Sequence, residues 1–436
     1  MATKGFSPRH AALSGAVDVP GSKSVSNRAL VCAALADGVS FLHGVADGDD
    51  TRRMIAAAQV LGASVELHED SVQVRGPIDR SAISHVVLDT GLAGTTSRFL
   101  TGVAALRRGP TTVTGEPGLR ARPMGELHRL VRALGATVSA EREGFLPVTV
   151  EGLDLASSAR QGAEPAVLTA RGDVSSQFIS AIMLVAPLLG GVRIRLEGPV
   201  VSREYLHMTA AVMQSFSANV LVRDGEIEVA GGNYRATTFV VDADWSSASY
   251  VFAAVAIAGG SATVPKLRVD TAQPEARFLE VLKAAGCSVR VRGDAQGVEV
   301  SRDMSRPLAG VDVDMSDMSD LVPTMAAIAA CASSPTVIRG VGFIRSKESD
   351  RLGDLAAELC KCGVRTEVQP DGLRIEPRPL RSSVLVPHDD HRLAMSFALL
   401  GLVQPDVSVE DPDVVGKSWP NFWSAMSSGL GLAVVG

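Results

Sequence analysis

Six segments of the chain begin with polar residues and continue as apolar, alanine-rich stretches of helical length. They occupy residues 26–38, 95–109, 175–191, 246–260, 320–334 and 391–405. Their starts recur roughly every 70 to 80 residues, a longer period than that of common solenoid repeats. A helix that is apolar on nearly every side is buried on every side. The pattern therefore predicts six buried helices, one in each copy of a repeat.

The residues between these helices follow a common order. Each apolar segment is followed by a short strand pattern, an amphipathic helix and two alternating strand patterns around a turn. Residues 40–45, 51–63 and 64–76 illustrate the order in the first copy. The repeat predicts a mixed α/β fold with the apolar helices at the centre, the sheets outside them and the amphipathic helices facing solvent.

The sixth copy is too short to hold its pair of alternating strands. We expect residues 10–21 to supply the missing strand, so the start of the chain packs with the C-terminal half. Three repeats then form each of two domains, residues 22–240 and residues 1–21 plus 241–436, and the chain crosses between them near residues 21 and 240. A length of 436 residues also favours two domains.

Charge and cysteine content narrow the possible functions. The formal net charge of −6 argues against general binding to nucleic acid or to anionic membranes, so any anion site needs a local group of cations. The five cysteines are scattered and lack C-x-x-C spacing, which is typical of reduced thiols in a cytoplasmic protein. The N-terminal residues carry no apolar signal segment, and the longest apolar stretch is interrupted by Pro187 and is too short to span a bilayer.

The polar starts of the six apolar helices differ, although the apolar bodies are alike. Helix N-termini attract anions and disfavour cations, so Lys23 with Arg28, and His391 with Arg392, indicate an anionic ligand. We interpret Thr95, Ser246 and Ser247 as helix N-caps. The polar residues at the six starts are Lys23, Ser24 and Arg28; Gly94, Thr95 and Arg98; Ser175, Ser176 and Gln177; Asp244, Ser246 and Ser247; Asp320; and Asp390, His391 and Arg392.

Other segments add cations. Arg120 and Arg122 precede an amphipathic helix, and Lys417 lies in a short polar segment near the C-terminus. Lys347 and Arg351 form a like-charge i,i+4 pair, which a merely solvated helix start would not favour. The run His388–His391 contains potential metal ligands, but no cysteine or glutamate completes a set, so we expect no metal site.

Eight motifs resemble, in the same order along the whole chain, those of the 5-enolpyruvylshikimate-3-phosphate synthase family. They are PGSKSVSNRA, LAGTTSRFL, RARPMGEL, DVSSQF, VSREY, SKESDRL, DDHRLAM and GKSWPNF. The resemblance implies an inverted α/β barrel of two domains, each built from three βαβαββ units, closing over a cleft. It also implies a transferase of the shikimate pathway of aromatic amino acid biosynthesis, without metal or organic cofactor. We expect a monomer, because the two domains can supply the whole site.

That family moves the enolpyruvyl group of phosphoenolpyruvate to the 5-hydroxyl of shikimate 3-phosphate and releases phosphate. The resemblance assigns binding of shikimate 3-phosphate to Lys23, Ser24, Arg28, Ser175, Ser176, Gln177, Ser202, Tyr205, Asp320 and Lys347. It assigns binding of phosphoenolpyruvate to Lys23, Gly94, Arg122, Gln177, Arg351, Arg392 and Lys417. Asp320, alone or assisted by Lys347, fits the base that deprotonates the hydroxyl. Glu348 or Lys417 fits the acid that protonates the methylene carbon, and Lys23 completes the catalytic set.

Some residues depart from the family, and two other functions compete. Gly94 stands as in relatives whose phosphoenolpyruvate subsite accepts glyphosate, whereas Leu92, Phe99 and Phe343 replace residues common in the family. One alternative is the related UDP-N-acetylglucosamine enolpyruvyl transferase, which carries a cysteine where this chain has Pro117. The other is a non-catalytic anion-binding protein, which would have no need of acidic groups beside a bound phosphate.

Overall fold

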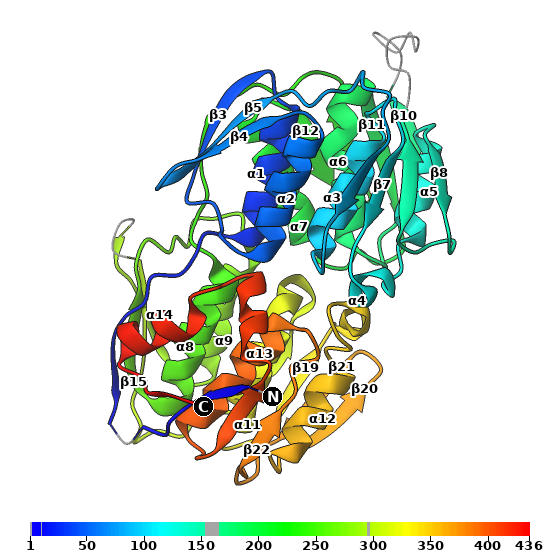
Figure 1. Ribbon diagram of the computed structural model, residues 1–436. Coiled ribbons are helices and arrows are strands. Elements are labelled where there is room, and N and C mark those ends of the chain that lie inside the picture. The colour runs from blue at the N-terminus through cyan, green and yellow to red at the C-terminus, as the bar shows by residue number, and fades with distance from the viewer. Residues whose placement is uncertain (1, 10, 153–164, 294–296) are drawn as a thin grey trace. The chain divides into compact units, whose positions relative to one another are not determined.

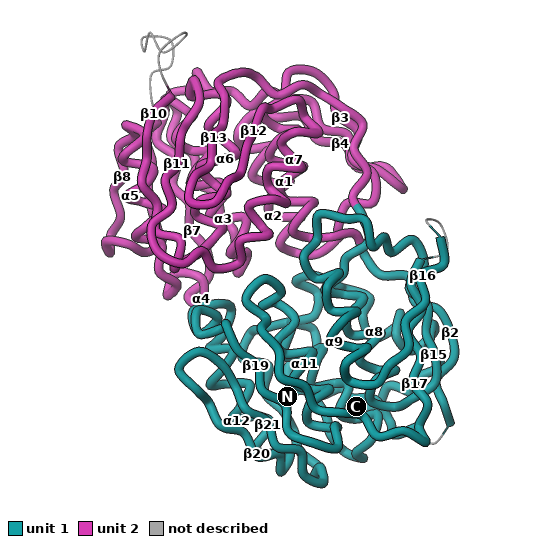
Figure 2. The backbone as a smooth tube through the Cα atoms, turned by 180° about the vertical axis from the view of Figure 1, so that it is seen from behind, with its two compact units in different colours: residues 1–20, 242–436 teal, residues 21–241 magenta. Residues whose placement is uncertain are grey.

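The computed structural model describes residues 2–9, 11–152, 165–293 and 297–436. The chain divides into two compact units, which Figure 2 shows in different colours. Unit 1 consists of residues 1–20 and 242–436, and unit 2 consists of residues 21–241. In the part of the chain described, each unit holds three four-stranded sheets.

Unit 2 is the contiguous one (Figure 1). Its helices are α1 (Lys23–Leu35), α2 (Asp49–Val60), α3 (Gly94–Ala104), α4 (Pro117–Arg120), α5 (Gly125–Ala133), α6 (Ser176–Val185), η1 (Ala186–Leu189) and α7 (Glu204–Ser215). Its first sheet, in spatial order, is β14 (Thr238–Val240), β3 (Gly38–His43), β5 (Ser71–Gly76) and β4 (Ser64–Leu67). The second is β6 (Val86–Asp89), β7 (Thr111–Thr114), β9 (Val148–Glu151) and β8 (Thr137–Ala140). The third is β10 (Ala166–Arg171), β11 (Gly191–Glu197), β13 (Glu226–Ala230) and β12 (Val220–Arg223).

Unit 1 is assembled from both ends of the chain. Its helices are α8 (Trp245–Ala258), η2 (Pro274–Arg277), α9 (Phe278–Ala284), η3 (Ser316–Leu321), α11 (Val322–Ala330), η4 (Gly342–Ser346), α12 (Gly353–Lys361), α13 (His391–Ala398), η5 (Leu399–Leu402), η6 (Pro412–Lys417) and α14 (Phe422–Leu430). Its first sheet is β16 (Ser288–Val291), β17 (Val298–Arg302), β15 (Gly260–Val264) and β2 (Leu13–Ala16). The second is β18 (Asp312–Asp314), β19 (Thr336–Arg339), β21 (Gly372–Glu376) and β20 (Arg365–Gln369). The third is β22 (Ser383–Leu385), β23 (Val407–Glu410), β1 (Thr3–Phe6) and β24 (Val434–Val435).

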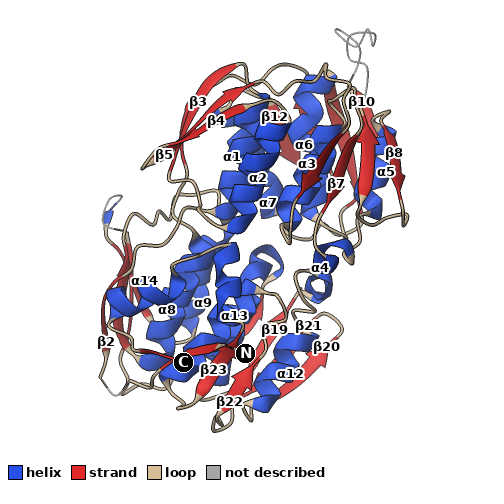
Figure 3. Ribbon diagram, in the orientation of Figure 1, coloured by secondary structure: helices blue, strands red, loops and turns tan. Residues whose placement is uncertain are grey.

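The six predicted apolar helices are confirmed as α1, α3, α6, α8, α11 and α13. Every residue of α8, α11 and α13 is buried, and α1 is buried from Val25 to its end. The helices that follow are amphipathic as predicted: α2, for example, buries only part of its surface, around Met54, Ala57 and Ala58. Within each unit the buried helices lie inside the strands, whereas amphipathic helices such as α5 lie further out, as the blue and red segments of Figure 3 show. The alternation of apolar and polar segments thus places the polar starts of the buried helices where side chains of several repeats can meet.

The sheets show how the chain passes from one unit to the other. In four sheets, the strand before a buried helix runs parallel to the strand after it: β6 with β7, β10 with β11, β18 with β19 and β22 with β23. In the other two sheets, the strand before a buried helix pairs instead with the strand that follows a buried helix of another repeat. Strand β2 precedes α1 but pairs with β15, which follows α8, and β14 precedes α8 but pairs with β3, which follows α1. Each of the two chain crossings is therefore preceded by a strand that is fixed in the unit being left.

The prediction for residues 10–21 was wrong in its detail. The strand that completes the sixth sheet is β1, which lies between β23 and β24, whereas β2 belongs to the sheet of β15. Residue 10 lies outside the described residues. The burial of Phe6 explains the difference, because its ring packs 5.9 Å from Phe422 and 5.2 Å from Trp423, centroid to centroid. After Leu13, strand β2 has only small residues, and a Cβ added at Gly15 would meet the Gly429 carbonyl oxygen at 1.9 Å.

Two further findings bear on the sequence predictions. All five cysteines lie in described segments and are free. Of the helices described, none is both long and apolar enough to cross a membrane.

Candidate active site

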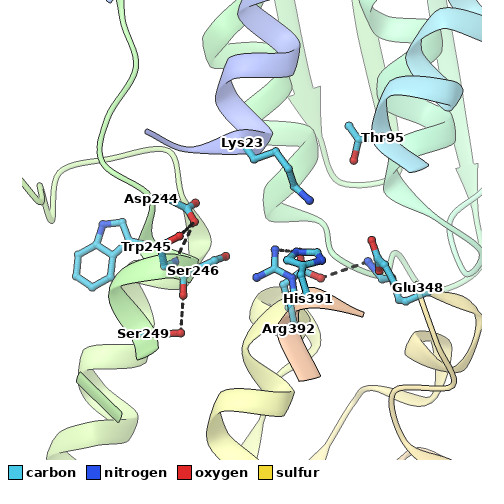
Figure 4. A network of polar contacts seen from close by, with 12 residues as sticks. Lys23, Thr95, Asp244, Trp245, Ser246, Ser249, Glu348, His391 and Arg392 are labelled. Atoms are coloured by element: carbon cyan, nitrogen blue, oxygen red, sulfur yellow. Dashed lines mark hydrogen bonds and ion pairs between the residues drawn. The ribbon is translucent and has the colours of Figure 1, made fainter. Parts of the chain in front are cut away.

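The predicted site residues of unit 2 lie at the starts of its buried helices. Lys23 begins α1, Gly94 begins α3, and Ser176 begins α6. Figure 4 shows Lys23 and Thr95 on their helices. Neither α1 nor α3 has a side-chain cap or an acidic residue in its first turn. Their N–H groups and dipoles are therefore not compensated from within these helices, which favours an anionic ligand.

Lys23 makes an ion pair within unit 2. Its Nζ lies 2.9 Å from Oδ2 of Asp50, and the side chains are 11% and 3% exposed. The main chain of Asp50 is also tied to α3, because Thr96 Oγ1 donates a hydrogen bond of 2.9 Å to the Asp50 carbonyl oxygen. Asp50 does not stand out in the sequence, since an acidic residue near a helix start is also what ordinary favourable helix electrostatics predicts.

Gly94 is a point of close approach between α3 and two arginines. A Cβ added there would lie 2.8 Å from Nη1 of Arg122 and 3.4 Å from Nη1 of Arg98. Arg98 also bonds Gln177 Oε1, and Gln177 Nε2 donates to Thr95 Oγ1 at 3.2 Å. Gly94, Arg122 and Gln177, which were predicted to bind the same substrate, therefore belong to one connected group.

Half of the residues predicted to bind shikimate 3-phosphate in unit 2 are buried, namely Arg28, Ser176, Ser202 and Tyr205, and the other half are half-buried. Arg28 is held by Thr209 Oγ1 at 2.7 Å from its Nε and by the Ser24 carbonyl oxygen at 2.8 Å from its Nη1. Ser202 adopts a left-handed backbone conformation (φ 51°), and its buried Oγ has no hydrogen-bond partner among the described residues. Buried hydroxyls in folded proteins are generally hydrogen-bonded, so Ser202 Oγ is available to bond a ligand.

Arg351 is the centre of the corresponding group in unit 1. Its side chain is only 1% exposed, and it contacts three carboxylates. Its Nε and Nη2 lie 2.6 and 3.3 Å from the two oxygens of Asp390, its Nη1 lies 2.8 Å from Oδ1 of Asp320, and its Nη2 lies 2.6 Å from Oε2 of Glu348. These contacts join η3, the segment before α12 and the start of α13 into one charged cluster.

Asp320 receives two more cations. Arg392 Nη2 donates to its Oδ2 at 2.8 Å, and Lys347 Nζ lies 3.7 Å from its Oδ1. Burial alone would raise the pKa of Asp320, but attraction to Arg392, Lys347 and Arg351 outweighs burial and holds that pKa well below its usual range. The carboxylate is therefore ionised and, in this state, a weak base.

Glu348 connects Arg351 to the last predicted cation. Its Oε1 lies 3.7 Å from Lys417 Nζ, and the Lys417 side chain is 5% exposed. Lys347, for its part, lies 5.9 Å from the ring centroid of Phe343, so the aromatic residue that replaces the family's usual one faces an ammonium group. The cluster holds four cations (Lys347, Arg351, Arg392 and Lys417) and three carboxylates (Asp320, Glu348 and Asp390). One positive charge is left over, which suits an anionic ligand.

Asp390 has a structural role that its sequence position alone does not indicate. It is fully buried, its Oδ1 accepts a hydrogen bond from the Arg392 backbone N–H at 2.9 Å, and both its oxygens hold Arg351. It thus caps α13 and fixes a cation at once. The potential metal ligands on either side of it do not gather: in the part of the chain described, no group of His, Cys, Asp or Glu side chains could hold a metal ion.

The N-cap interpretation of three residues was wrong. Asp244 caps α8, because its Oδ2 accepts the Ser247 backbone N–H at 2.9 Å. Ser246 and Ser247 lie inside the helix, as Figure 4 shows for Ser246 beside Asp244. The residue before α3 is Ala93, and Thr95 accepts a bond from Gln177 instead of capping. An Asp side chain competes well for the N-cap position, and the sequence offered several candidates within four residues.

Comparison with known proteins gives a consistent result. Residues 8–426 match the family model described as EPSP synthase (3-phosphoshikimate 1-carboxyvinyltransferase). The chain is 40% identical over 427 residues to the 3-phosphoshikimate 1-carboxyvinyltransferase of Methanosphaerula palustris, covering 97% of this chain and 98% of the relative. It is 36% identical to the enzyme of the same name from a Nostoc species, covering 94% and 95%.

The fold is also similar to solved structures. An EPSP synthase structure from Acinetobacter baumannii superposes with a TM-score of 0.78 at 26% sequence identity, and the match covers 100% of both chains. The mixed α/β fold of two units is therefore similar to that of solved EPSP synthases.

Proposed function

The chain belongs to the EPSP synthase family, as its motifs predicted, and on that premise we propose that it transfers the enolpyruvyl group of phosphoenolpyruvate to the 5-hydroxyl of shikimate 3-phosphate and releases phosphate. The reaction makes the protein a transferase of the shikimate pathway, which leads to the aromatic amino acids. The observation that carries the proposal beyond the family match is the cluster around Arg351, where cations outnumber carboxylates in a largely buried setting. Both substrates carry several negative charges, so such a cluster suits them.

We infer that the two units are the two domains of an inverted α/β barrel, each with three βαβαββ repeats. The proposed domains are residues 22–240 and residues 1–21 plus 241–436, with hinges near residues 21 and 240. The buried helices with their outer sheets and the exchange of β2 and β14 support this. The substrates would bind in the cleft between these domains, and closure would exclude water and strengthen every charge contact.

Shikimate 3-phosphate is proposed to bind mainly through unit 2. Ser24 and Arg28 would hold the carboxylate, and Ser175, Ser176 and Ser202 would hold the phosphate. The unpaired hydroxyl of Ser202 supports this assignment. Gln177 and Tyr205 would lie against the ring. The remaining proposed contacts come from the charged side chains Lys23, Asp320 and Lys347.

Phosphoenolpyruvate is proposed to bind through cations of both units. Lys23, Arg122 and the Gly94 backbone come from unit 2, with Gln177 beside them. The close approach of Gly94 to Arg122 supports their acting together. The cations that unit 1 would supply are Arg351, Arg392 and Lys417. Arginine suits this task because its planar guanidinium can donate two parallel hydrogen bonds to a carboxylate or phosphate.

The proposed chemistry is addition followed by elimination. Asp320, assisted by Lys347, would take the proton from the 5-hydroxyl, which attacks the central carbon of phosphoenolpyruvate. Glu348, or Lys417 beside it, would give a proton to the methylene carbon, and Lys23 would stabilise the phosphate. The tetrahedral intermediate would then lose phosphate and one methyl proton to regenerate the enol ether.

The charge around Asp320 suggests how the base becomes active only with substrate. Without ligand, Arg392, Lys347 and Arg351 hold its pKa low, so it would abstract a proton poorly. A bound phosphoenolpyruvate would share those cations and weaken their hold on Asp320, and the pKa would rise. Under this proposal the carboxylates of the cluster pair with its cations before the substrate binds, and the anionic groups of the substrate then share these cations.

The remaining proposals concern the state of the protein. We propose that it acts as a monomer on these two small molecules, without a nucleic acid or membrane partner, and in the cytoplasm, where free cysteines persist.

Phosphate release tests the proposed function. The purified protein would be incubated with both substrates, with either one alone, and with phosphoenolpyruvate plus UDP-N-acetylglucosamine. We expect phosphate only with shikimate 3-phosphate and phosphoenolpyruvate together, in equal amount to an enolpyruvyl product followed by ³¹P NMR. The proposal would be refuted if phosphate were released with the UDP-sugar instead of shikimate 3-phosphate. It would also be refuted if no phosphate were released with either acceptor.

A further inference from the structure

We propose that Asp50 is a positioning residue of the active site, which fixes the ammonium group of Lys23 and joins the starts of α1, α2 and α3 to one another. The inference deepens the proposed function and rests on it, because Lys23 is placed there in contact with both substrates. Asp50 itself has no proposed contact with either.

The first observation is the ion pair itself. Lys23 Nζ and Asp50 Oδ2 are 2.9 Å apart, and the carboxylate is almost fully buried. A free lysine side chain has four rotatable bonds and gains rotamer entropy when released. Asp50 holds the ammonium in one place before substrate arrives, so the ordering does not have to occur at each binding event.

The second observation is independent of the Asp50 side chain. The Asp50 carbonyl oxygen accepts a hydrogen bond from Thr96 Oγ1 at 2.9 Å, and Thr96 lies two residues after Gly94 in the first turn of α3. The side chain of Asp50 thus holds α1 while its main chain holds α3. Two of the helix starts that carry proposed substrate contacts are connected through one residue.

The position of Asp50 on α2 explains how a buried carboxylate is tolerated there. It is the second residue of α2, whose N-cap is Gly48 and makes no side-chain cap. The positive end of the helix dipole and the Lys23 ammonium both stabilise its charge. Asp49, the residue before it, is exposed and lies in the same turn, so it offers a matched control with the same charge.

The kinetic test uses Asp50→Asn, Asp50→Ala and the control Asp49→Asn. The main-chain bond to Thr96 remains in every variant, so we expect folded proteins with unchanged circular dichroism. Displacement of Lys23 by a fraction of an ångström to an ångström should lower kcat/KM for phosphoenolpyruvate about 10- to 100-fold for both Asp50 variants. Asp49→Asn should stay within about twofold of the unmodified protein.

A double-mutant cycle separates positioning from general support. If Asp50 acts through Lys23, Asp50→Ala should add less than about twofold to the loss already caused by Lys23→Ala. Fully multiplicative losses in the double variant would mean that Asp50 acts independently of Lys23 and would overturn the inference. Equal activity of Asp50→Asn and Asp49→Asn would overturn it as well.

A measurement without substrates keeps the inference testable even if the proposed function fails. Brief acetylation with acetic anhydride, followed by mass spectrometry of the peptide that holds Lys23, reports how accessible its amine is. We expect several-fold faster labelling in Asp50→Asn than in the unmodified protein, and no change in Asp49→Asn. Equal labelling in all three proteins would refute the positioning role, whereas absent phosphate release with faster labelling would refute only the proposed function.

Discussion

Replacing Asp390 by Asn should destabilise unit 1 strongly while leaving its backbone contacts in place. The amide oxygen of Asn can still accept the Arg392 N–H that caps α13. The negative charge opposite Arg351 is lost, however. If the new amide oxygen keeps the hydrogen bond from the Arg392 N–H, the amide NH₂ group faces the Arg351 guanidinium, and both groups are donors. Arg351 cannot escape to water, because its side chain is 1% exposed.

The size of the effect follows from that burial. Removing one partner of a buried ion pair costs about 3–5 kcal/mol, since the other charge is left in a medium that solvates it poorly. Asp320 and Glu348 still contact Arg351 at 2.8 and 2.6 Å, so we take the lower end, about 3 kcal/mol. An exposed ion pair gives about 0–1 kcal/mol.

Tryptophan fluorescence during urea denaturation measures this change in unit 1 selectively. The chain has three tryptophans, Trp245, Trp419 and Trp423, and all are buried in unit 1. With a denaturant slope of about 3 kcal/mol/M, a loss of about 3 kcal/mol lowers the midpoint by about 1 M urea. The control is Asp317→Asn, which removes a carboxylate 3.0 Å from Arg277, where the arginine side chain is 65% exposed.

Two results would show whether buried charge pairing stabilises the cluster around Arg351. If Asp390→Asn and Asp317→Asn shift the midpoint equally, buried charge pairing does not stabilise the cluster and the reasoning is wrong. If it is right, removing the guanidinium as well, in the double variant Arg351→Met with Asp390→Asn, should restore part of the lost stability relative to Asp390→Asn alone, because the α13 cap is kept and no unpaired guanidinium is then buried. The double variant should still lack activity, since Arg351 is proposed to bind phosphoenolpyruvate.

Three further predictions follow from other parts of the structure. Asp320→Asn should lower kcat about 10²- to 10⁴-fold with little change in KM, as steady-state kinetics would show; an unchanged kcat removes Asp320 from the base role. Gly94→Ala places a methyl group 2.8 Å from Arg122 Nη1, so KM for phosphoenolpyruvate should rise about tenfold or more, and an unaltered KM would contradict the proposed subsite. Burial lowers the pKa of His128 from its ordinary 6.5 to about 4, because the buried imidazole favours its neutral form. The free energy of unfolding of unit 2 should therefore be at its full value above pH 6.5 and should decrease by about 3 kcal/mol as the pH falls towards 4. Hydrogen exchange of α5 amides at pH 7 and 4.5 should show this loss, and His128→Leu should remove most of it.

The helices could be predicted from sequence because their signal is local. An uninterrupted apolar run such as residues 250–258 has few ways to avoid water other than in a buried helix, and α8 is buried throughout. The pairing of β2 with β15 could not be predicted in the same way. The two strands are separated by more than 240 residues, and nothing in the short sequence of β2 marks its partner.

The candidate site was predictable where residue type was unusual for its position. Lys23 and Arg28 at a helix start, and the like-charge pair Lys347 and Arg351, contradict ordinary helix electrostatics and so stand out. Asp50 and Asp390 agree with those electrostatics, since acidic residues are favoured at helix N-termini. Their second role, holding a cation, depends on which other element packs beside them, and only the structure provides that.

The pairing of β1 has a consequence for synthesis on the ribosome. This strand is made among the first residues, yet its partners β23 and β24 lie at residues 407–410 and 434–435. At about 5–20 residues per second, β1 waits roughly 20 to 80 s for them. Unit 2 is contiguous and can complete its three sheets in that interval, while Phe6 stays exposed to chaperones until the last strand is made. The order of translation therefore favours completion of unit 2 first and makes the closing of the β1 sheet the final step.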